Sequence, residues 1–357
     1  MSPLIHGSKK LPLDQDKTVF DYADDLKIRV PTSCGRTGEC HECIVEIKQG
    51  TDGLTHRTES EKFLKDRYRL ACQAKITDPS TNLEFSVLRR QPKILTTSIN
   101  RKITADPITC KVDNFVRYGD RKLEEYKGSI FGLAIDLGTT TVAMNLVDLE
   151  KHVTIYTASF ENPQKFGGSD VMNRISYDGG PYHGELRKVI LSSINFEIGD
   201  MCRKLNLHRR RIYEVVLVGN STMRDIVFGV DVQSIGEKPY KSKIEQEFIG
   251  GERKSTALNI LAEDLGIRIF PKANIYGGPL IASHVGSDVS ADLLAIGMDE
   301  MTENVMLVDI GTNTEVIIGN RDRILAASCP AGPAFEGGEI KFGMAGYEGA
   351  VEAVKIG

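Results

Sequence analysis

The sequence lacks long apolar runs, and it lacks an excess of charge of either sign. Residues 1–17 contain no apolar stretch that could form the core of a signal peptide, and no segment approaches the ~20 apolar residues of a membrane span. With 45 basic and 49 acidic residues the formal net charge is −4, which does not indicate a nucleic-acid or polyanion binder. We therefore expect a cytoplasmic protein that binds neither membranes nor nucleic acids.

Cysteine is also scarce, and its distribution argues against disulfide bonds. The chain has 7 cysteines, an odd number, and four of them fall within residues 34–72. In a reducing compartment such a group indicates a metal site. The other three, Cys110, Cys202 and Cys329, are isolated in the sequence, and we expect them to be small buried hydrophobic residues.

The spacing of the four grouped cysteines is typical of an iron–sulfur site. Five residues separate Cys34 from Cys40, two separate Cys40 from Cys43, and twenty-eight separate Cys43 from Cys72. Plant-type ferredoxins use a similar spacing to hold a [2Fe-2S] cluster on four thiolates. The first three thiolates would come from one loop, and the fourth would come from a distant strand or turn.

Zinc is the main alternative, because Cys40–Cys43 is a Cys-x2-Cys element. Structural zinc sites usually pair two such elements, whereas Cys34 and Cys72 do not form a second one. Gly35 and Gly38 favour the iron–sulfur interpretation, since glycine lets the loop wrap and brings backbone N–H groups toward cluster sulfurs.

Three regions of the chain differ in composition and pattern. Residues 1–90 are rich in turn residues, with β-like runs at 44–48 and 83–88, and predict a small β-rich module. Residues 91–129 are polar without a sustained period, which predicts a linker with a strand or two. From 130 to 357, apolar strands, helices and glycine-bearing loops alternate, which predicts an α/β domain.

The α/β region contains an internal repeat. The segment Phe131–Asp148 is echoed by Asn304–Arg321, so we expect two copies of one β-hairpin. A helix is expected between them, at about 185–205. In each copy an acidic residue precedes a glycine turn and polar side chains, as Asp136-Leu137-Gly138-Thr139-Thr140-Thr141 and as Asp309-Ile310-Gly311-Thr312-Asn313-Thr314.

The two turns predict phosphate-binding loops. Glycine lets the backbone approach a phosphate, and turn N–H groups and polar side chains can donate to its oxygens. Asp136 and Asp309 are the candidate catalytic residues, because a carboxylate at a strand end can hold Mg²⁺ or its waters. The candidate nucleotide-binding residues are Gly138, Thr139, Thr140, Gly311, Thr312 and Asn313. One such motif is as often plain turn geometry, but two copies in equivalent contexts favour a ligand.

Two resemblances imply folds for the two parts. The sequences VPTSCGRTGECHECIVEI (30–47) and YRLACQAKI (68–76) resemble plant-type and adrenodoxin-like ferredoxins, which implies an α+β, β-grasp [2Fe-2S] domain. The stretch before Phe20 is short for the opening hairpin of that fold, so we expect a clipped or irregular first strand. The duplicated hairpin resembles the actin, Hsp70 and sugar-kinase superfamily, which implies an α/β actin-like ATPase domain of the ribonuclease-H-like type.

An ordered set of further motifs resembles one family over nearly the whole chain. That family reductively activates corrinoid-dependent methyltransferase systems and joins an N-terminal [2Fe-2S] ferredoxin domain to an actin-like ATPase domain. The motifs are Asn162-Pro163-Gln164, Gly168-Ser169-Asp170-Val171, Val218-Gly219-Asn220-Ser221-Thr222-Met223 and Pro330-Ala331-Gly332-Pro333-Ala334-Phe335-Glu336-Gly337. From the residues alone, Asn220 and Ser221 indicate a turn or helix cap more than a ligand, and Glu336 fits a catalytic carboxylate or a loop carboxylate equally.

The resemblance implies ATP-dependent reductive activation of a corrinoid protein. One electron from the cluster would return Co(II) cobalamin to Co(I), with ATP and Mg²⁺ bound between the two hairpin turns. The implied partners are a corrinoid protein or corrinoid-dependent methyltransferase and a low-potential electron donor, and a homodimer is compatible with this function. Family members continue beyond residue 357, so we expect the ATPase domain to be incomplete at its C-terminus.

Three other functions are open at this point. The chain could be a [2Fe-2S] electron-transfer or docking protein whose truncated actin-like domain does not hydrolyse ATP. A small-molecule kinase is less favoured, because phosphoryl transfer does not require a redox centre. Dehydratase activators of the actin-like type resemble proteins with a bridging [4Fe-4S] cluster instead of a ferredoxin domain.

Overall fold

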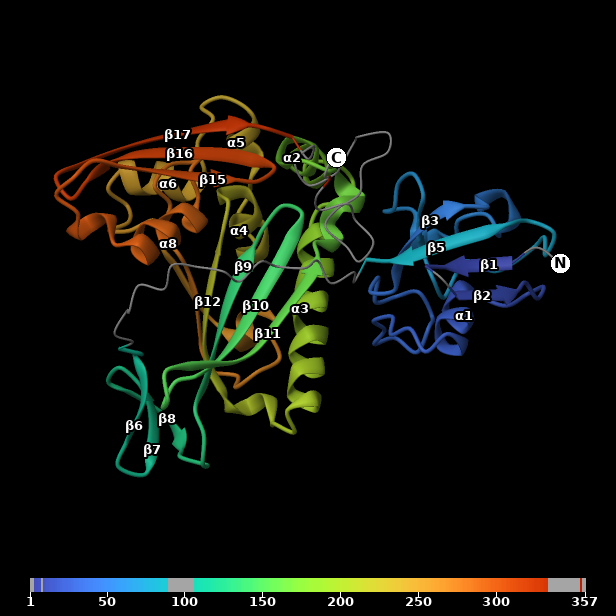
Figure 1. The fold of residues 1–357 in the computed structure, drawn as a ribbon, viewed down its shortest axis with the longest axis horizontal. Coiled ribbons are helices and arrows are strands. Elements are labelled where there is room, and N and C mark those ends of the chain that lie inside the picture. The colour runs from blue at the N-terminus through green and yellow to red at the C-terminus, as the bar shows by residue number, and fades with distance from the viewer. Residues whose placement is uncertain (1–2, 8, 89–105, 333–353, 355–357) are drawn as a thin grey trace.

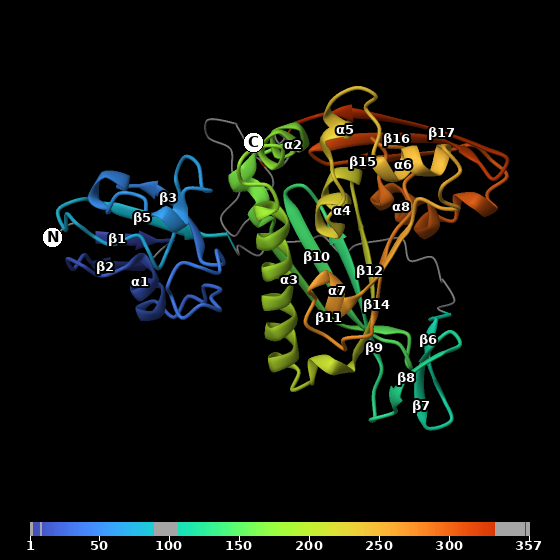
Figure 2. The ribbon, with the colours of Figure 1, turned by 180° about the vertical axis from the view of Figure 1, so that it is seen from behind.

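The structure, a computed structural model, describes residues 3–7, 9–88, 106–332 and 354. A small N-terminal module lies beside the long helix α3 (Glu185–Lys204) of a larger α/β body (Figures 1 and 2). Among the described residues no helix has both the length and the hydrophobicity to cross a membrane.

The N-terminal module is a mixed five-stranded sheet of order β2-β1-β5-β3-β4 with a short helix, α1 (Val19–Asp25). The capping box of Thr18 and Asp21 starts α1, since the Thr18 hydroxyl accepts from the Asp21 N–H at 3.1 Å. The strands are β1 (Pro3–His6), β2 (Lys9–Pro12), β3 (Ile44–Gln49), β4 (Tyr68–Leu70) and β5 (Leu83–Val87), with 3-10 turns η1 (Thr51–Gly53) and η2 (Glu59–Glu61). This arrangement confirms the ferredoxin-like α+β fold.

The opening hairpin of this module is present, which corrects the expectation of a clipped or irregular first strand. Strands β1 and β2 pair in continuous register from Pro3↔Pro12 to His6↔Lys9, and β1 also runs parallel to β5. The hairpin is short because Gly7, with φ of +58°, turns the chain immediately after β1. Four residues per strand are enough here, because Leu4 is fully buried against the module core.

The region 91–129, expected to be a linker with a strand or two, has three strands in its described part. Strands β6 (Thr109–Val112), β7 (Phe115–Tyr118) and β8 (Arg121–Glu125) form a separate antiparallel sheet. It lies at the lower end of the α/β body in Figure 1 and contacts it through Tyr213, whose hydroxyl donates to Glu124 at 2.7 Å.

The α/β body is built on a six-stranded sheet of order β11-β10-β9-β12-β14-β13. Strand β12 is parallel to both β9 and β14, and the other pairs are antiparallel. The strands are β9 (Phe131–Leu137), β10 (Thr141–Asp148), β11 (Val153–Glu161), β12 (Ile212–Gly219), β13 (Leu258–Leu261) and β14 (Asn274–Gly277). The helical elements are η3 (Pro163–Gly167), α2 (Val171–Asp178), α3, η4 (Arg209–Arg211), α4 (Ser221–Phe228), α5 (Gln233–Gly236), α6 (Lys243–Ile249), α7 (Ala262–Leu265), α8 (Ser287–Ile296) and η5 (Met298–Glu300).

Helix α3 forms where the sequence predicts a helix at 185–205, and it covers one face of this sheet (Figure 1). Its buried residues Ile190, Ile194, Ile198 and Met201 recur every three or four positions and form one apolar stripe. Cys202 lies beside that stripe and is buried, as expected.

The predicted repeat is confirmed as two β-hairpins. The first is β9–β10, and the second is β15 (Val305–Ile310) with β16 (Asn313–Asn320), which β17 (Arg323–Pro330) extends into a three-stranded sheet. One face of that sheet packs on α8 and η5 through Ile317. The other face exposes apolar side chains, namely Met306, Val308, Ile310, Ile318 and Leu325.

Two of the three isolated cysteines differ from expectation. Cys110 on β6 and Cys329 on β17 are exposed. The prediction of burial was wrong for them because each lies on a small sheet with a face that no described element covers. A sequence pattern shows that a strand has two faces, but it does not show whether a layer covers each face.

Candidate functional site

The fold brings the four grouped cysteines together in two pairs. Cys34, Cys40 and Cys43 lie in the loop between α1 and β3, and Cys72 follows β4. The sulfur atoms of Cys43 and Cys72 are 3.4 Å apart, and Cys34 and Cys40 hydrogen-bond through their side chains. Segments almost thirty residues apart in the sequence therefore supply one sulfur site, because strand β4 pairs with β3.

These pairs fit a two-iron centre. With metal–sulfur bonds of ~2.3 Å, tetrahedral geometry separates two thiolates on one metal by ~3.8 Å, close to the Cys43–Cys72 separation. Each iron would take one pair, Cys34 with Cys40 and Cys43 with Cys72. Within the described residues no three Cys, His, Asp or Glu side chains are grouped as a single ion would need.

The loop geometry also suits thiolates. Gly35 and Gly38 have φ of +65° and +90°, and a Cβ on Gly38 would lie 3.0 Å from the Gln73 side chain. Burial raises the pKa of Cys34, but hydrogen bonds from Thr37 and from the backbone of Cys40 and Gly38 outweigh it and lower that pKa to about 5. A thiolate is the form that binds metal.

The Cys43–Cys72 pair behaves as one thiol donating to one thiolate. The hydrogen bond from Cys43 lowers the pKa of Cys72 to about 7 against the opposing effect of burial, and the Gln73 amide also donates to Cys72 at 3.4 Å. The same bond, followed by burial, raises the pKa of Cys43.

The two hairpin turns meet across a cleft of about 450 Å³ in the α/β body. The hydroxyls of Thr140 and Thr312, one from each turn, are 3.0 Å apart. All eight residues proposed from the two motifs line this cleft: Asp136, Gly138, Thr139, Thr140, Asp309, Gly311, Thr312 and Asn313. Two turns whose threonines are 172 positions apart in the sequence thus form one site.

Close backbone contacts and the side chain of Asn162 fix the first turn, at Gly138. A Cβ on Gly138 would lie 2.5 Å from the Thr141 carbonyl oxygen, so only glycine fits the turn. Asn162, fully buried, donates from Nδ2 to the Gly138 carbonyl at 2.8 Å, and its N–H donates to the Thr140 carbonyl at 2.7 Å. The asparagine of the Asn162-Pro163-Gln164 motif therefore positions the loop and does not line the cleft.

Asn220 serves both as a helix cap and as a cleft residue. Its side-chain oxygen accepts from the Met223 N–H at 3.0 Å and starts α4, while its Nδ2 donates to the Thr139 hydroxyl at 2.8 Å. Ser221 is buried and donates to the Ala282 carbonyl at 3.3 Å, which is a structural role.

The second turn is held by the start of the Pro330–Gly337 motif. The N–H groups of Ala331 and Gly332 donate to the Thr312 carbonyl at 3.2 and 2.9 Å. Residues 333–337 of that motif, Glu336 included, lie outside the described residues.

Three further carboxylates, which the sequence analysis did not identify, also line the cleft. Asp288 and Asp292 lie four residues apart on α8, and Glu315 follows the second turn on β16. The i, i+4 spacing of two aspartates after Gly286 was a weak signal, since acidic residues also occupy first helical turns for their effect on the helix dipole.

The pKa values of all five cleft carboxyl groups are raised, so ionising each of them costs more free energy than in water. Burial, followed by the charge of Asp309, raises the pKa of Asp136 to about 6, although its side chain opens into the cleft. Burial raises the pKa of Asp288 and of Asp292 to about 7, and the neighbouring carboxylates add to the effect. Burial also raises the pKa of Asp309 and of Glu315.

No lysine or arginine is among the described residues that line this cleft. A polyphosphate entering it would need a cation to balance the carboxylates. Mg²⁺ commonly keeps several waters and binds one or two carboxylates together with substrate phosphates. The two turns and the acidic wall fit that mode of binding.

The cluster loop contacts the α/β body directly. Nδ1 of His41, which lies between Cys40 and Cys43, is 2.8 Å from Oε2 of Glu185 in the first turn of α3. The His41 ring stacks on Phe63 with centroids 4.2 Å apart.

Phe63 of the N-terminal module also contacts residues of the α/β body. Its ring meets Phe166 of η3 edge-on at 5.6 Å, and its carbonyl accepts from the Tyr177 hydroxyl at 2.6 Å. Element η3 begins at Pro163, directly after Asn162, which holds the Gly138 turn. The cysteine loop and the Gly138 turn are therefore linked through packed side chains.

Three family models match successive parts of the chain. Residues 5–77 match the 2Fe-2S iron-sulfur cluster binding domain, residues 131–301 match the RACo middle region, and residues 303–357 match the C-terminal domain of RACo, the ASKHA domain. The chain thus has a cluster-binding domain followed by an actin-like ATPase fold, as predicted.

Two curated proteins and one solved structure are similar to this chain. Corrinoid activation enzyme RamQ of Eubacterium limosum is 26% identical over 99% of this chain and 64% of its own length. A [Co(II) methylated amine-specific corrinoid protein] reductase of Methanosarcina barkeri is 26% identical over 63% of this chain and 41% of its own length. The solved structure of a reductive activator for corrinoid,iron-sulfur protein matches with a TM-score of 0.59 at 26% identity, covering 96% of this chain and 65% of that chain. The chain therefore spans about two thirds of the length of the first of these relatives.

Proposed function

We propose that this chain, which belongs to the family of reductive activators of corrinoid proteins, passes one electron to a corrinoid protein in an ATP-dependent manner. The acceptor would be Co(II) cobalamin, which becomes Co(I) on gaining the electron. The electron would come from a low-potential donor protein, so each turnover moves one electron in and one out.

Cys34, Cys40, Cys43 and Cys72 would hold the cluster, in the two pairs described above. A bound [2Fe-2S] cluster supplies a one-electron couple at about −400 mV in plant-type ferredoxins. Co(II) cobalamin is reduced at a still lower potential, and each 59 mV of mismatch costs a factor of ten for one electron. Electron delivery therefore needs an energy input, and ATP is the available source.

The cleft between the two turns would hold the nucleotide. Backbone N–H groups of the Gly138 and Gly311 turns and the hydroxyls of Thr140 and Thr312 would donate to phosphate oxygens. Asp136 and Asp309 would hold Mg²⁺ through its waters and would orient the attacking water. The Thr140–Thr312 hydrogen bond would be replaced by bonds to phosphate when the nucleotide enters.

The single observation that carries this proposal is the continuous contact between the two loops. Asn162 ties the Gly138 turn to η3, Phe166 of η3 packs on Phe63, and Phe63 stacks on His41 in the cysteine loop. A shift of the turn on nucleotide binding would move η3 and thereby the surface around the cysteine loop. ATP would in this way control how the cluster domain presents itself to a partner.

Stopped-flow reduction of a Co(II) corrinoid protein tests the proposal. The chain, reconstituted with iron and sulfide and reduced beforehand, is mixed with the corrinoid protein with and without Mg-ATP, and Co(I) is followed by its absorbance. We expect Co(I) formation only with Mg-ATP. Equal rates without ATP, together with no heat of ATP binding in calorimetry, would instead identify an electron-transfer or docking protein whose actin-like part does not hydrolyse ATP.

A further inference from the structure

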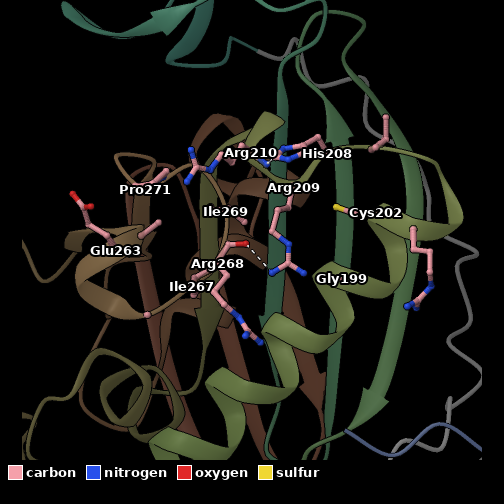
Figure 3. A pocket seen from close by; sticks show the side chains of 14 residues that line it. Gly199, Cys202, His208, Arg209, Arg210, Glu263, Ile267, Arg268, Ile269 and Pro271 are labelled. Carbon is pink, nitrogen blue, oxygen red and sulfur yellow. Dashed lines mark hydrogen bonds between the residues drawn. The ribbon is translucent and has the colours of Figure 1, made fainter. Parts of the chain in front are cut away.

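A second pocket, of about 720 Å³, lies at the C-terminal end of α3 (Figure 3). It is formed by the last turn of α3, by η4 and by the loop 266–271. Strand β12 separates it from the nucleotide cleft, since β12 starts next to η4 at Ile212 and ends at Gly219 beside Asn220. Eight extended residues span roughly 25 Å, so the two sites do not overlap.

Buried hydrogen bonds hold the walls of this pocket in place. Asn195 of α3, which is 6% exposed, donates to the Gly266 carbonyl at 2.8 Å and accepts from the Arg268 N–H at 2.6 Å. His208 caps η4 by accepting from the Arg210 N–H at 3.2 Å. The pocket is thus a formed feature of the fold.

Arg209 is fixed in the middle of the pocket (Figure 3). Its Nη1 donates to the Arg268 carbonyl at 3.3 Å. Its guanidinium lies against Gly199 of α3, where a Cβ would come within 2.7 Å of Nη2. Glycine at that position therefore leaves room for the guanidinium beside the helix, and the Arg268 carbonyl takes one of the five N–H donors of Arg209.

The residues that line the pocket carry a net positive charge. Arg203, Arg209, Arg210 and Arg268 line the pocket, and Glu263 is the one acidic residue among the described lining residues. Arg203 is paired with Asp200 of its own helix. No described carboxylate forms an ion pair with Arg209, Arg210 or Arg268. Arg209 is half-buried and Arg210 and Arg268 are exposed, so the pocket carries a net positive charge that a bound anion would balance.

The floor between these arginines is apolar. Leu207, Ile267, Ile269 and Pro271 contribute to it, and Ile267 and Ile269 are buried. Arginine recognises phosphate and carboxylate groups through paired N–H donors. Pockets that bind small molecules have volumes of about 300–1,000 Å³ with mostly apolar walls and a few polar groups, which describes this pocket.

We propose that this pocket binds a small organic anion that carries a phosphate on a flat apolar body. The apolar body would lie on the floor, and Arg209, Arg210 and Arg268 would contact the phosphate. A protein segment is a less suitable occupant, because stable protein interfaces bury more than about 1,000 Å² over a flatter surface. The proposal does not depend on the function proposed for the nucleotide cleft.

Titration calorimetry of the full chain with 1-naphthyl phosphate tests this site, because that probe has the proposed chemistry without being a nucleotide. We expect saturable binding that weakens at least about ten-fold in the Arg210→Gln, Arg268→Gln double variant. The matched control is Arg321→Gln, which removes an exposed arginine on the hairpin between β16 and β17 and should leave binding unchanged. Uncharged 1-naphthol should bind at least ten-fold more weakly than the phosphate.

Each of three results would overturn the proposal. The first is an absence of saturable binding to the unaltered chain, and the second is equal affinity for 1-naphthol and 1-naphthyl phosphate. The third is binding that the double variant retains while its thermal unfolding matches that of the control. Binding of a glutamate-rich peptide but not of 1-naphthyl phosphate would point to a protein partner and would also overturn it.

Discussion

At the scale of single residues, the most informative side chains are buried carboxyl groups whose pKa values the fold lowers or raises. Glu61 is fully buried, yet its pKa is lowered, because hydrogen bonds from Arg69, Thr58 and Leu70 outweigh the effect of burial. The cleft aspartates have the opposite shift, since no basic group pairs with them among the described lining residues. Buried carboxylates without a basic partner favour bound protons or a cation, which is why the cleft suits the Mg²⁺ proposed above.

Cys72→Ser should abolish the rhombic EPR signal of the reduced, reconstituted chain, because serine does not replace the fourth thiolate. The signal should persist in Cys110→Ser, which alters an exposed cysteine on β6 far from the loop. An unchanged signal in Cys72→Ser would remove this residue from the proposed ligand set.

Asp292→Asn should stabilise the chain at high pH. Burial and neighbouring carboxylates raise the pKa of Asp292 to about 7, above the ordinary value of 3.8, so the folded state retains the proton more strongly than the unfolded state. Wild-type stability therefore falls as pH rises from about 4 to about 7, and the variant avoids that loss. We expect a gain of about 1–2 kcal/mol at pH 8, discounted for partial solvent exposure, and almost none at pH 4.5.

Urea unfolding at the two pH values measures this gain. Asp299→Asn, at an exposed position in η5, is the matched control and should change neither value. A gain of the same size at both pH values would show that packing, and not ionisation, causes it. Mg²⁺ should stabilise the wild type more than Asp292→Asn, since the cation balances the same charge.

At the scale of elements, η3 connects the two candidate sites. Its first residue follows Asn162, and its Phe166 ring lies between Phe63 and Tyr177, with centroids at 5.6 and 5.5 Å. A short turn held at both ends is suited to move as a unit, so the proposed function predicts that a change at the Gly138 turn reaches the cluster domain through η3.

Phe166→Leu should weaken the effect of ATP on electron delivery and spare both sites. Leucine keeps an apolar group in the core at a stability cost of about 1–1.5 kcal/mol but loses the edge-on contact with Phe63. Stopped-flow rates with and without Mg-ATP should converge, while the EPR signal and the heat of ATP binding persist. Phe248→Leu, on an exposed ring, should leave the ATP effect intact. If Phe166→Leu kept the full ATP effect, η3 would not be the connection.

At the scale of the whole molecule, the cluster domain is docked along α3 by polar contacts. His41 meets Glu185 and Arg29 pairs with Asp200, near the two ends of the helix, and Lys188 donates to the Glu39 carbonyl at 3.2 Å between them. Interfaces between domains commonly permit relative motion, and the polar contacts along α3 are the part that salt or substitution can weaken. Phe63 and Phe166 add an apolar contact beside them.

The double variant Arg29→Ala, Glu185→Ala should release the cluster domain from α3. Small-angle scattering should show a larger radius of gyration, and the wild type should approach the same value at high salt because exposed ion pairs are screened. Lys62→Ala, which removes a pair within the cluster domain, is the control and should not change the radius. An unchanged radius in the double variant would mean that apolar contacts around Phe63 hold the domains together.

Local features of the sequence were enough to predict a good part of this molecule. The cysteine spacing and the duplicated Asp-x-Gly-Thr turn each depend on residues close together in the chain, and the ferredoxin-like and actin-like folds that the resemblance to known families implied are both present. The opening hairpin was underestimated, because one glycine turn can make a complete hairpin from a very short stretch.

By itself, then, the sequence determined the turns, helices and ligand spacings, since near neighbours set these, and its resemblance to known families implied the fold of each domain. Tertiary structure alone decided which distant residues share a site. It placed Asp288, Asp292 and Glu315 beside Asp136, joined His41 to Glu185 across 144 positions, and gathered the arginines of the second pocket around α3. Those contacts depend on how sheets and helices pack, and the period of a sequence shows which face of an element is buried but not which distant element covers it.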